Sequence, residues 1–415
     1  MTTNVTTGTP SPGVSAPVTG ATTSENGFKD FGIEPEIFSQ IAKHFSIPTP
    51  IQAGVIPVAN SGRDIVGIAQ TGTGKTLAYA IPVLQRLFAH GGQGIVLVPT
   101  RELALQVDEV FQKIGKPLNL RSCVVIGGMS MFAQKQTLAR KPHVIIATPG
   151  RLIDHLRQHT YSLDKLNVIV LDEADRMLDV GFLPDISRIL EGAPKEHQTM
   201  LFSATLPVEI AGIAERFMVN PERIQVASPG TTAERVDHGL FIARKEDKMG
   251  VLEEVLATFD GTVLVFSRTK FGAKRITMGL IAKGHSAAEI HSDRSLAQRR
   301  EALEGFKKGK YRVLVATDIA ARGIDVTGIG LVVNYDLPDN PHDYVHRIGR
   351  TGRAGMEGKA LSFATPEQHS DVRQIERVIR APLPVVEGSH HQFRQEPAFD
   401  RRRTLSGRRP THRRR

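Results

Sequence analysis

Short apolar runs alternate with amphipathic segments through most of this chain, and no other feature limits its folds as strongly. The apolar runs start at residues 64, 94, 122, 143, 168 and 199 in the first half and at residues 239, 262, 287, 311, 331 and 359 in the second. Segments with helical spacing, such as RELALQVDEVFQKI from residue 101, lie between them. This alternation predicts parallel sheets with helices packed on both faces.

One polar segment divides this pattern in two. The stretch SPGTTAERVDHG contains proline and glycine, and we expect a linker at residues 228–238. The divided pattern predicts two doubly wound α/β domains, over residues 28–227 and 239–386. Residues 1–24 contain no charged side chain and are mostly Thr, Ser, Gly and Pro, so residues 1–27 are predicted to be a disordered leader.

Basic charge is concentrated at the carboxyl end. The net charge of the chain is +10, and residues 389–415 contribute +7 of it, through nine arginines against Glu396 and Asp400. Residues 387–415 are therefore predicted to be a disordered Arg-rich tail. Such a tail acts either as a solvated end or as an arm that holds nucleic-acid phosphates.

Cysteine content and hydropathy bear on the compartment. Cys123 is the only cysteine, so no disulfide can form within the chain and a reducing compartment is expected. The apolar runs are far shorter than a membrane span, and the first residues lack the basic and apolar regions of a signal peptide. We therefore expect a cytoplasmic protein with no membrane attachment.

The loop after the first apolar run has the composition of a phosphate-binding loop. Gly72 and Gly74 let the backbone turn its N–H groups towards phosphate oxygens, Lys75 can reach the outer phosphates, and Thr76 can be a ligand for Mg²⁺. The nucleotide-binding residues predicted here are Ala69, Gln70, Thr71, Gly72, Thr73, Gly74, Lys75 and Thr76. The alternative is a glycine-rich turn that only starts a helix.

A pair of carboxylates follows a later apolar run. In VIVLDEAD, Asp172 stands at the carboxyl end of the expected strand, where it can hold a metal ion. Glu173 is then placed to orient and deprotonate an attacking water. The alternative is an acidic first turn of the helix that continues into DRML, since carboxylates favour helix N-termini. Together with the phosphate loop, the pair favours a nucleoside triphosphate site.

Three arginines near the carboxyl end require an anion. The stretch HRIGRTGRAG places Arg347, Arg350 and Arg353 three residues apart with no acidic residue among them. Guanidinium groups this close repel one another unless an anion lies between them. Either a bound nucleotide or a nucleic-acid backbone can supply it, and Arg347 is the first candidate for a nucleic-acid contact.

Seven short motifs follow one another along the chain: AQTGTGKT, PTREL, TPGR, DEAD, SAT, ATDIAARGIDV and HRIGRTGR. This ordered set resembles that of the DEAD-box ATP-dependent RNA helicases, over residues 28–385. The short body with a basic tail is most like the bacterial RhlE subgroup. The resemblance implies two tandem RecA-like domains, ATP and Mg²⁺ as cofactors, RNA as the main partner, and a monomer. It also makes ribonucleoprotein and RNA-decay proteins candidate partners.

The resemblance implies further nucleotide contacts. Gln52, in HFSIPTPIQ, would pair through its amide with adenine, and Phe28 would stack on the same base. The alternative for Phe28 is a core aromatic residue. Arg350 and Arg353 would reach the γ-phosphate when the two domains close, while Asp325 would contact the ribose. The implied catalytic set is Lys75, Asp172, Glu173, Arg350 and Arg353.

RNA contacts and coupling residues come from the same resemblance. The implied RNA contacts are Pro99, Thr100, Arg101, Gly127, Gly128, Thr148, Gly150 and Arg151 in the first domain, and Arg268, Thr269, Arg299 and Thr317 in the second. Backbone N–H groups and hydroxyls suit phosphate contacts that carry no sequence information. Asp175, Ser203, Ala204 and Thr205 would link hydrolysis to RNA binding. Helix capping is the alternative for Asp175 and Ser203.

The sequence thus predicts an RNA-dependent ATPase that clamps one RNA strand and unwinds short duplexes locally. Two alternatives stay open. One is an ATP-gated RNA clamp or RNA chaperone with little unwinding, and the other, with less support, is a DNA-unwinding motor. Glu173 favours the enzyme, because a clamp could dispense with a catalytic base.

Overall fold

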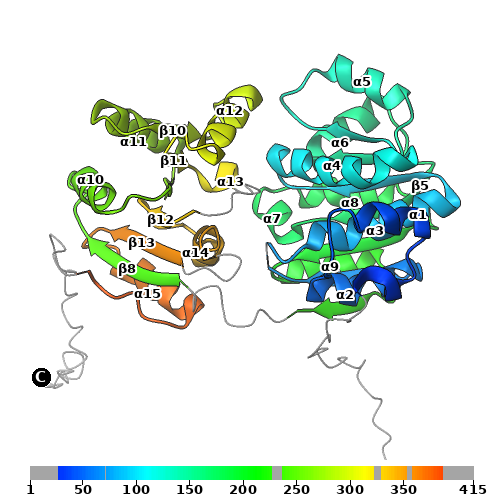
Figure 1. Cartoon of the computed structure of the whole chain (residues 1–415), viewed down its shortest axis with the longest axis horizontal. Coiled ribbons are helices and arrows are strands. Elements are labelled where there is room, and N and C mark those ends of the chain that lie inside the picture. Colours follow the sequence, from blue (N-terminus) through cyan, green and yellow to red (C-terminus); the bar gives the residue numbers. More distant parts are fainter. Residues whose placement is uncertain (1–26, 71, 227–235, 322–328, 353–357, 387–415) are drawn as a thin grey trace, which may run out of the picture.

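The computed structural model describes residues 27–70, 72–226, 236–321, 329–352 and 358–386. Within them, two α/β domains lie side by side, and each is a parallel sheet covered by helices (Figure 1). The predicted fold class is therefore confirmed. The predicted leader, up to residue 26, and the predicted Arg-rich tail lie outside the described residues.

The first sheet has seven parallel strands in the order β3-β4-β2-β5-β6-β1-β7. Their bounds are β1 Ile65–Ile68, β2 Gln93–Leu97, β3 Ser122–Val125, β4 Val144–Ala147, β5 Leu166–Leu171, β6 Gln198–Ser203 and β7 Glu222–Gln225. Successive side chains of a strand point to opposite faces, so Val96 joins one layer of the core while Ile95 and Leu97 join the other. Because both faces are buried, the strands read as continuous apolar runs.

Local signals set the starts of the first-domain helices. The Thr100 hydroxyl accepts a hydrogen bond from the N–H of Leu103 (3.2 Å) and caps α4, while Oε1 of Gln52 accepts one from the N–H of Thr49 (2.9 Å) at the start of α2. The helices are α1 Pro35–Ile41, α2 Pro50–Asn60, α3 Lys75–His90, α4 Arg101–Gly115, α5 Met131–Ala139, α6 Pro149–Arg157, α7 Ala174–Asp179, α8 Leu183–Glu191 and α9 Val208–Phe217. Two 3₁₀ turns, η1 Gly27–Phe31 and η2 Lys116–Leu118, complete this domain.

The second sheet has six parallel strands in the order β10-β11-β9-β12-β13-β8. The strands are β8 Val236–Ile242, β9 Val263–Phe266, β10 Ala287–Ile290, β11 Val313–Ala316, β12 Leu331–Asn334 and β13 Gly358–Ala364. The helices are α10 Lys248–Thr258, α11 Lys270–Ala282, α12 Leu296–Lys307, α13 Asp318–Ala321, α14 Pro341–Ile348 and α15 His369–Ile379.

Every predicted apolar run contains a strand, but one strand and one boundary were predicted wrongly. Strand β7 was missed because its sequence, ERIQ, is polar and buries only Ile224. The linker prediction of residues 228–238 is wrong at its end, since β8 already starts at Val236. The Val236 side chain is buried, and Val236 pairs with Gly358 of β13. Residues with a linker-like composition therefore belong to the sheet.

Hydropathy along the helices gives one further result. Among the residues that the structure describes, no helix combines the length and the apolar character needed to cross a bilayer.

Candidate functional site

The loop between β1 and α3 is shaped by its glycines. Gly72 and Gly74 have φ angles of +83° and +90°, a left-handed backbone that favours glycine. A Cβ atom at Gly74 would also collide with Nε2 of Gln52. Lys75, the first residue of α3, is buried, and its Nζ donates a hydrogen bond to the carbonyl of Ala69 (2.9 Å). The loop thus wraps tightly and opens into a long helix, as a phosphate site requires.

Asp172 lies at the carboxyl end of β5, two strands from β1 in the sheet. One of its carboxylate oxygens accepts a hydrogen bond from the N–H of Glu173 (2.9 Å), and the other accepts one from the hydroxyl of Tyr79 (2.8 Å). Burial raises the pKa of Asp172 to about 6, although the positive charge of Lys75 opposes this. The sequence reasoning missed Tyr79. Its position four residues after Lys75, on the same side of α3, is the signal that could have found it.

Glu173 has an unusual backbone. Its φ and ψ angles are 51° and 52°, so a non-glycine residue occupies the left-handed region immediately before α7. Its side chain makes no capping hydrogen bond to that helix, so capping does not account for a glutamate at this position. Strained backbone of this kind is concentrated at functional sites, because the surrounding structure must hold it.

The predicted coupling residues lie together. The N–H of Asp175 donates to the Ser203 hydroxyl (3.2 Å), and the carboxylate of Asp175 accepts from both the N–H (2.9 Å) and the hydroxyl (2.8 Å) of Thr205. Burial would raise the pKa of Asp175, but the hydrogen bonds from Thr205 hold it below its usual value. Asp175 therefore connects the helix after Glu173 to the loop after β6, which contains Ala204.

Gln52 and Phe28 have different surroundings. Gln52 lies against the phosphate loop, where its Nε2 donates to the carbonyl of Gly74 (3.0 Å) and its Oε1 accepts from the N–H of Thr49 (2.9 Å). Phe28 is buried in the core and packs edge-on against Phe31 with 5.8 Å between ring centroids. The structure therefore favours the core alternative for Phe28, and its stacking on adenine stays a prediction.

A cavity of about 340 Å³ lies between the domains, and most of the predicted RNA contacts line it. Arg101 lies across the Gly127–Gly128 turn, where a Cβ at Gly128 would collide with its guanidinium. Arg151 donates to the carbonyl of Met129 (3.0 Å). The predicted residues that line the cavity are Pro99, Thr100, Arg101, Gly127, Thr148, Gly150, Arg151 and Arg299.

Of the RNA contacts predicted in the second domain, only Arg299 lines this cavity. Arg299 lies 2.9 Å from a carboxylate oxygen of Glu102, and both side chains are 8% exposed, so an ion pair between the domains occupies this guanidinium. Thr317 stands at the start of α13, whose Ala320 lines the cavity. Elsewhere, Thr269 caps α11 by accepting from the N–H of Gly272 (3.0 Å), and Arg268 pairs with Asp339 (3.1 Å).

The three arginines of HRIGRTGRAG do not share one role. Arg347 is 2% exposed, donates to both carboxylate oxygens of Asp318 (2.6 Å each), and lies 5.0 Å from the Phe266 ring centroid. Its interpretation as a nucleic-acid contact is therefore wrong: its counter-anion is internal. Arg350 lines a small cavity between the domains together with Arg176. Arg353, like Asp325 and Thr71, lies outside the described residues.

These features define a class of protein. Two parallel α/β domains face each other, one with a phosphate loop beside a carboxylate pair and the other with an arginine at the interface. A second cavity between the same domains is lined by backbone turns, hydroxyls and arginines. This is the organisation of a two-domain nucleoside triphosphatase that handles a second, anionic ligand.

Comparison with known sequences identifies the family. Residues 49–213 match the model of the DEAD/DEAH box helicase family, and residues 247–355 match that of the helicase conserved C-terminal domain. The DEAD-box ATP-dependent RNA helicase CshA of Bacillus licheniformis is 43% identical over 360 residues, which are 86% of this chain and 74% of that protein. The protein of the same name from Bacillus subtilis is 42% identical over 86% and 73% of the two chains. The chain belongs to the DEAD-box ATP-dependent RNA helicase family.

Solved structures agree with this assignment across both domains. S. cerevisiae Dbp5 bound to RNA and ADP BeF3 is 30% identical, with a TM-score of 0.75 over 87% of this chain and 95% of that one. The DEAD-box helicase Mss116 bound to ssRNA and UDP-BeF is 28% identical, with a TM-score of 0.78 over 88% of this chain and 80% of that one.

Proposed function

We propose that this chain is an RNA-dependent ATPase that closes on one RNA strand when ATP binds and separates short duplexes locally. ATP hydrolysis to ADP and phosphate then reopens it. The observation that carries the proposal is that Asp175, two residues after Glu173, is hydrogen-bonded to Ser203 and Thr205. These bonds connect the segment that carries the carboxylate pair to the end of the neighbouring strand, β6. Family membership and the RNA-bound neighbours support the same function.

The residues present fit ATP together with Mg²⁺. The phosphate loop supplies N–H groups and Lys75 for the phosphates, and Thr76 with Asp172 offers one hydroxyl and one carboxylate for the metal. Among the described residues no cluster of three His, Cys, Asp or Glu side chains could hold a metal by itself. Mg²⁺ takes one or two protein ligands and completes its shell with phosphate oxygens and water, and Thr76 and Asp172 would be those two ligands. When bound, the ion would neutralise charge on the phosphates.

The chain's own residues would then carry the hydrolysis. Glu173 would orient the attacking water and accept its proton, held by a backbone that the fold constrains. Arg350, with Arg353, would stabilise the charge that develops on the transferred phosphoryl group. Gln52, next to Gly74, would read the adenine.

RNA would lie along the cavity between the domains. Its lining suits sugar and phosphate contacts, so we propose low sequence specificity, with the 2′-hydroxyl excluding DNA. A monomeric, cytoplasmic protein with ribonucleoprotein or RNA-decay partners remains our proposal. So does its placement near the RhlE subgroup, although the relatives named above are CshA proteins.

Matched RNA and DNA strands test this function. We expect single-stranded RNA to stimulate ATP hydrolysis by the full chain, and DNA of the same sequence to stimulate it far less, because the 2′-hydroxyl contacts are missing. Steady-state phosphate release measures the rate of ATP hydrolysis with each nucleic acid. Equal stimulation by DNA would favour the DNA-unwinding motor, and RNA-dependent ATP binding without turnover would favour the clamp.

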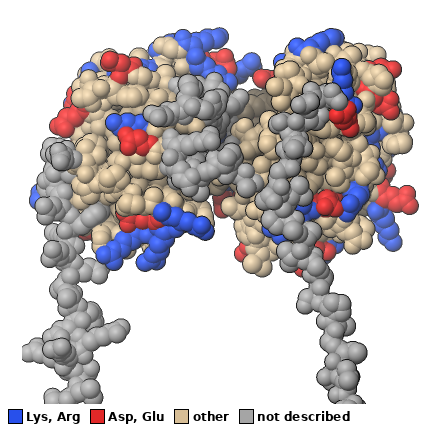
Figure 2. All heavy atoms as spheres, turned by 60° about the horizontal axis from the view of Figure 1, so that its bottom comes forward, with Lys and Arg blue, Asp and Glu red and all other residues tan. Residues whose placement is uncertain are grey.

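Removing the Arg-rich tail tests its contribution to RNA affinity. Lys and Arg side chains are interspersed with Asp and Glu on the face of both domains shown in Figure 2. The tail contributes +7 of the net charge of +10. Deleting residues 389–415 should raise the RNA concentration needed for half-maximal ATPase and leave kcat at saturating RNA nearly unchanged. The plot of log Kd for RNA against log salt should become shallower. An unchanged slope would identify the tail as a solvated end.

A further inference from the structure

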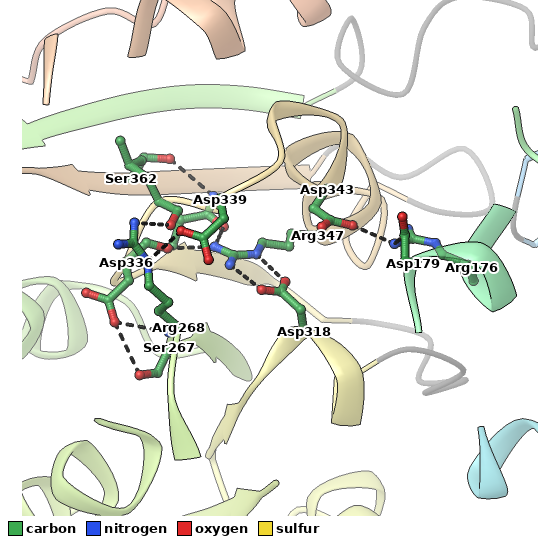
Figure 3. A network of polar contacts seen from close by, with 12 residues as sticks. Arg176, Asp179, Ser267, Arg268, Asp318, Asp336, Asp339, Asp343, Arg347 and Ser362 are labelled. Carbon is green, nitrogen blue, oxygen red and sulfur yellow. Dashed lines mark hydrogen bonds and ion pairs between the residues drawn. The ribbon is translucent and has the colours of Figure 1, made fainter. Parts of the chain in front are cut away.

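An ion pair joins the two domains directly beside the DEAD motif (Figure 3). Arg176, the residue that follows the motif in α7, has its Nη1 2.6 Å from a carboxylate oxygen of Asp343 in α14 of the second domain. The two side chains are only 5% and 14% exposed. Asp179, on the same helix as Arg176, lies 3.8 Å from the same nitrogen. The guanidinium is therefore held between a carboxylate of its own helix and one from the opposite domain.

In the first domain, Arg176 lies next to Asp175 in α7, the helix that directly follows Glu173. Its N–H donates to one carboxylate oxygen of Asp175 (3.0 Å), while the other oxygen of Asp175 binds Thr205. Glu173 immediately precedes the same short helix, α7. The position of the Arg176 side chain therefore follows the position of α7 and of the residues that α7 orders.

In the second domain, Asp343 belongs to a helix that is itself anchored. Arg347, one turn later in α14, binds the carboxylate of Asp318 and donates to the carbonyl of Asp336 (2.6 Å). Asp318 directly follows Thr317, and the carboxylate of Asp336 accepts from the N–H of Arg268 (3.1 Å). Figure 3 shows Asp343 in contact with Arg176 and Arg347 in contact with Asp318, and the backbone of α14 connects these two sets of polar contacts.

A buried ion pair of this kind favours one relative placement of the two domains and adds little to the free energy of their association. Closing the domains removes both charges from water, and their attraction does little more than offset that loss, whereas a mispaired charge is costly. The pair therefore favours one placement of α14 against α7. In that placement Arg350, two residues beyond α14, lines the same cavity of about 10 Å³ as Arg176.

We propose that Arg176 and Asp343 are positioning residues that form an interdomain latch and set Arg350 against the nucleotide when the domains close. The proposal rests on the proposed ATPase function. It adds Arg176 and Asp343, which belong neither to the phosphate loop nor to the carboxylate pair, and neither is one of the arginines proposed to reach the γ-phosphate. Neither contacts substrate. Their effect on hydrolysis is exerted through α14.

A double-mutant cycle on the full chain tests the latch, with Arg176→Met, Asp343→Asn and the double variant. Each single change should lower RNA-stimulated kcat at least about tenfold, and the double variant should lose no more than the worse single one. The Kd of nucleotide without RNA should stay within about twofold of wild type, since the phosphate loop is intact. Energy transfer between dyes on the two domains, with a non-hydrolysable ATP analogue and RNA, should report a smaller closed population.

Arg216→Met is the matched control. It removes an arginine from a pair with Glu191 inside the first domain, where the side chains are 64% and 49% exposed, and kcat should not change. Thermal unfolding checks that each variant folds. If Arg176→Met does not fold, Arg176→Lys, which keeps the charge but loses the planar fork, should give an intermediate loss in the same cycle.

Two results would overturn the latch: losses that multiply in the double variant, or a closed population in Arg176→Met equal to that of wild type. Failure of the proposed function has a different signature, because the wild-type chain itself would then show no RNA-stimulated turnover.

Discussion

Replacing Glu173 with glutamine is expected to reduce ATP turnover by about 10²- to 10⁴-fold, the usual contribution of a positioned general base. The amide keeps the shape of the side chain but cannot accept the proton of the attacking water. Nucleotide binding should persist, because the phosphate loop, Lys75 and Asp172 are unchanged. Complexes with ATP and RNA should therefore accumulate in the closed form, which slow RNA release in the presence of ATP would show.

Lys75→Ala provides the contrast, since it should weaken nucleotide binding as well as abolish turnover. In the structure its ammonium group is buried at the loop, so its loss removes the only side-chain cation of that loop. Glu191→Gln is the matched control, because this carboxylate lies in an exposed pair with Arg216. Normal turnover by the Glu173→Gln protein would show that another group is the catalytic base.

Replacing Arg350 with alanine should lower kcat by about 10³- to 10⁵-fold, the effect of arginine fingers in phosphoryl transfer. Arg350 belongs to the second domain, whereas Gln52, Lys75, Thr76 and Asp172 all belong to the first. The Kd of nucleotide without RNA should therefore change little, and the loss should appear in the transition state. Lysine at this position should rescue poorly, because a point charge lacks the planar fork of guanidinium.

Arg353→Ala is expected to behave in the same way. Lys283→Ala, which breaks an exposed pair with Glu253 in the second domain, is the matched control and should leave kcat unchanged. Single-turnover hydrolysis measures the rate of the chemical step, and nucleotide titration without RNA measures the Kd of nucleotide. A large loss of nucleotide affinity in Arg350→Ala without RNA would contradict a role that requires domain closure.

Local patterns predicted most of the strands and the loops that form the candidate first-domain site. Continuous apolar runs mark strands buried on both faces, and the loops that follow β1 and β5 carry the phosphate and carboxylate motifs because parallel strands end at one edge. Where those patterns are weak, prediction failed. Strand β7 is polar, and the first residues of β8 have a linker-like composition.

Other features arise only when distant segments meet. Spacing could place Tyr79 on the Lys75 side of α3 and could offer the core as one alternative for Phe28, but it did not determine that Tyr79 bonds to Asp172, that Glu173 holds a left-handed backbone, or that Phe28 lies in the core. The Tyr79–Asp172 bond joins α3 to the end of β5, 93 residues apart in the chain, and the burial of Phe28 depends on core residues from several other elements. Burial likewise raises the pKa of Asp172, and burial is a property of the fold.

The sequence by itself determined the class of chemistry, because glycines, a lysine and paired carboxylates at these spacings suit few other ligands than a nucleoside triphosphate with its metal. Only the tertiary structure showed that the anion beside Arg347 is a carboxylate of the same domain. Arg347, Arg350 and Arg353 stand three residues apart in the motif, yet Arg347 is buried against Asp318, a residue 29 positions earlier. Arg176 and Arg299 instead pair across the domains with Asp343 and Glu102. Charge pairing depends on distance in space and on burial, and neither can be read from spacing along the chain.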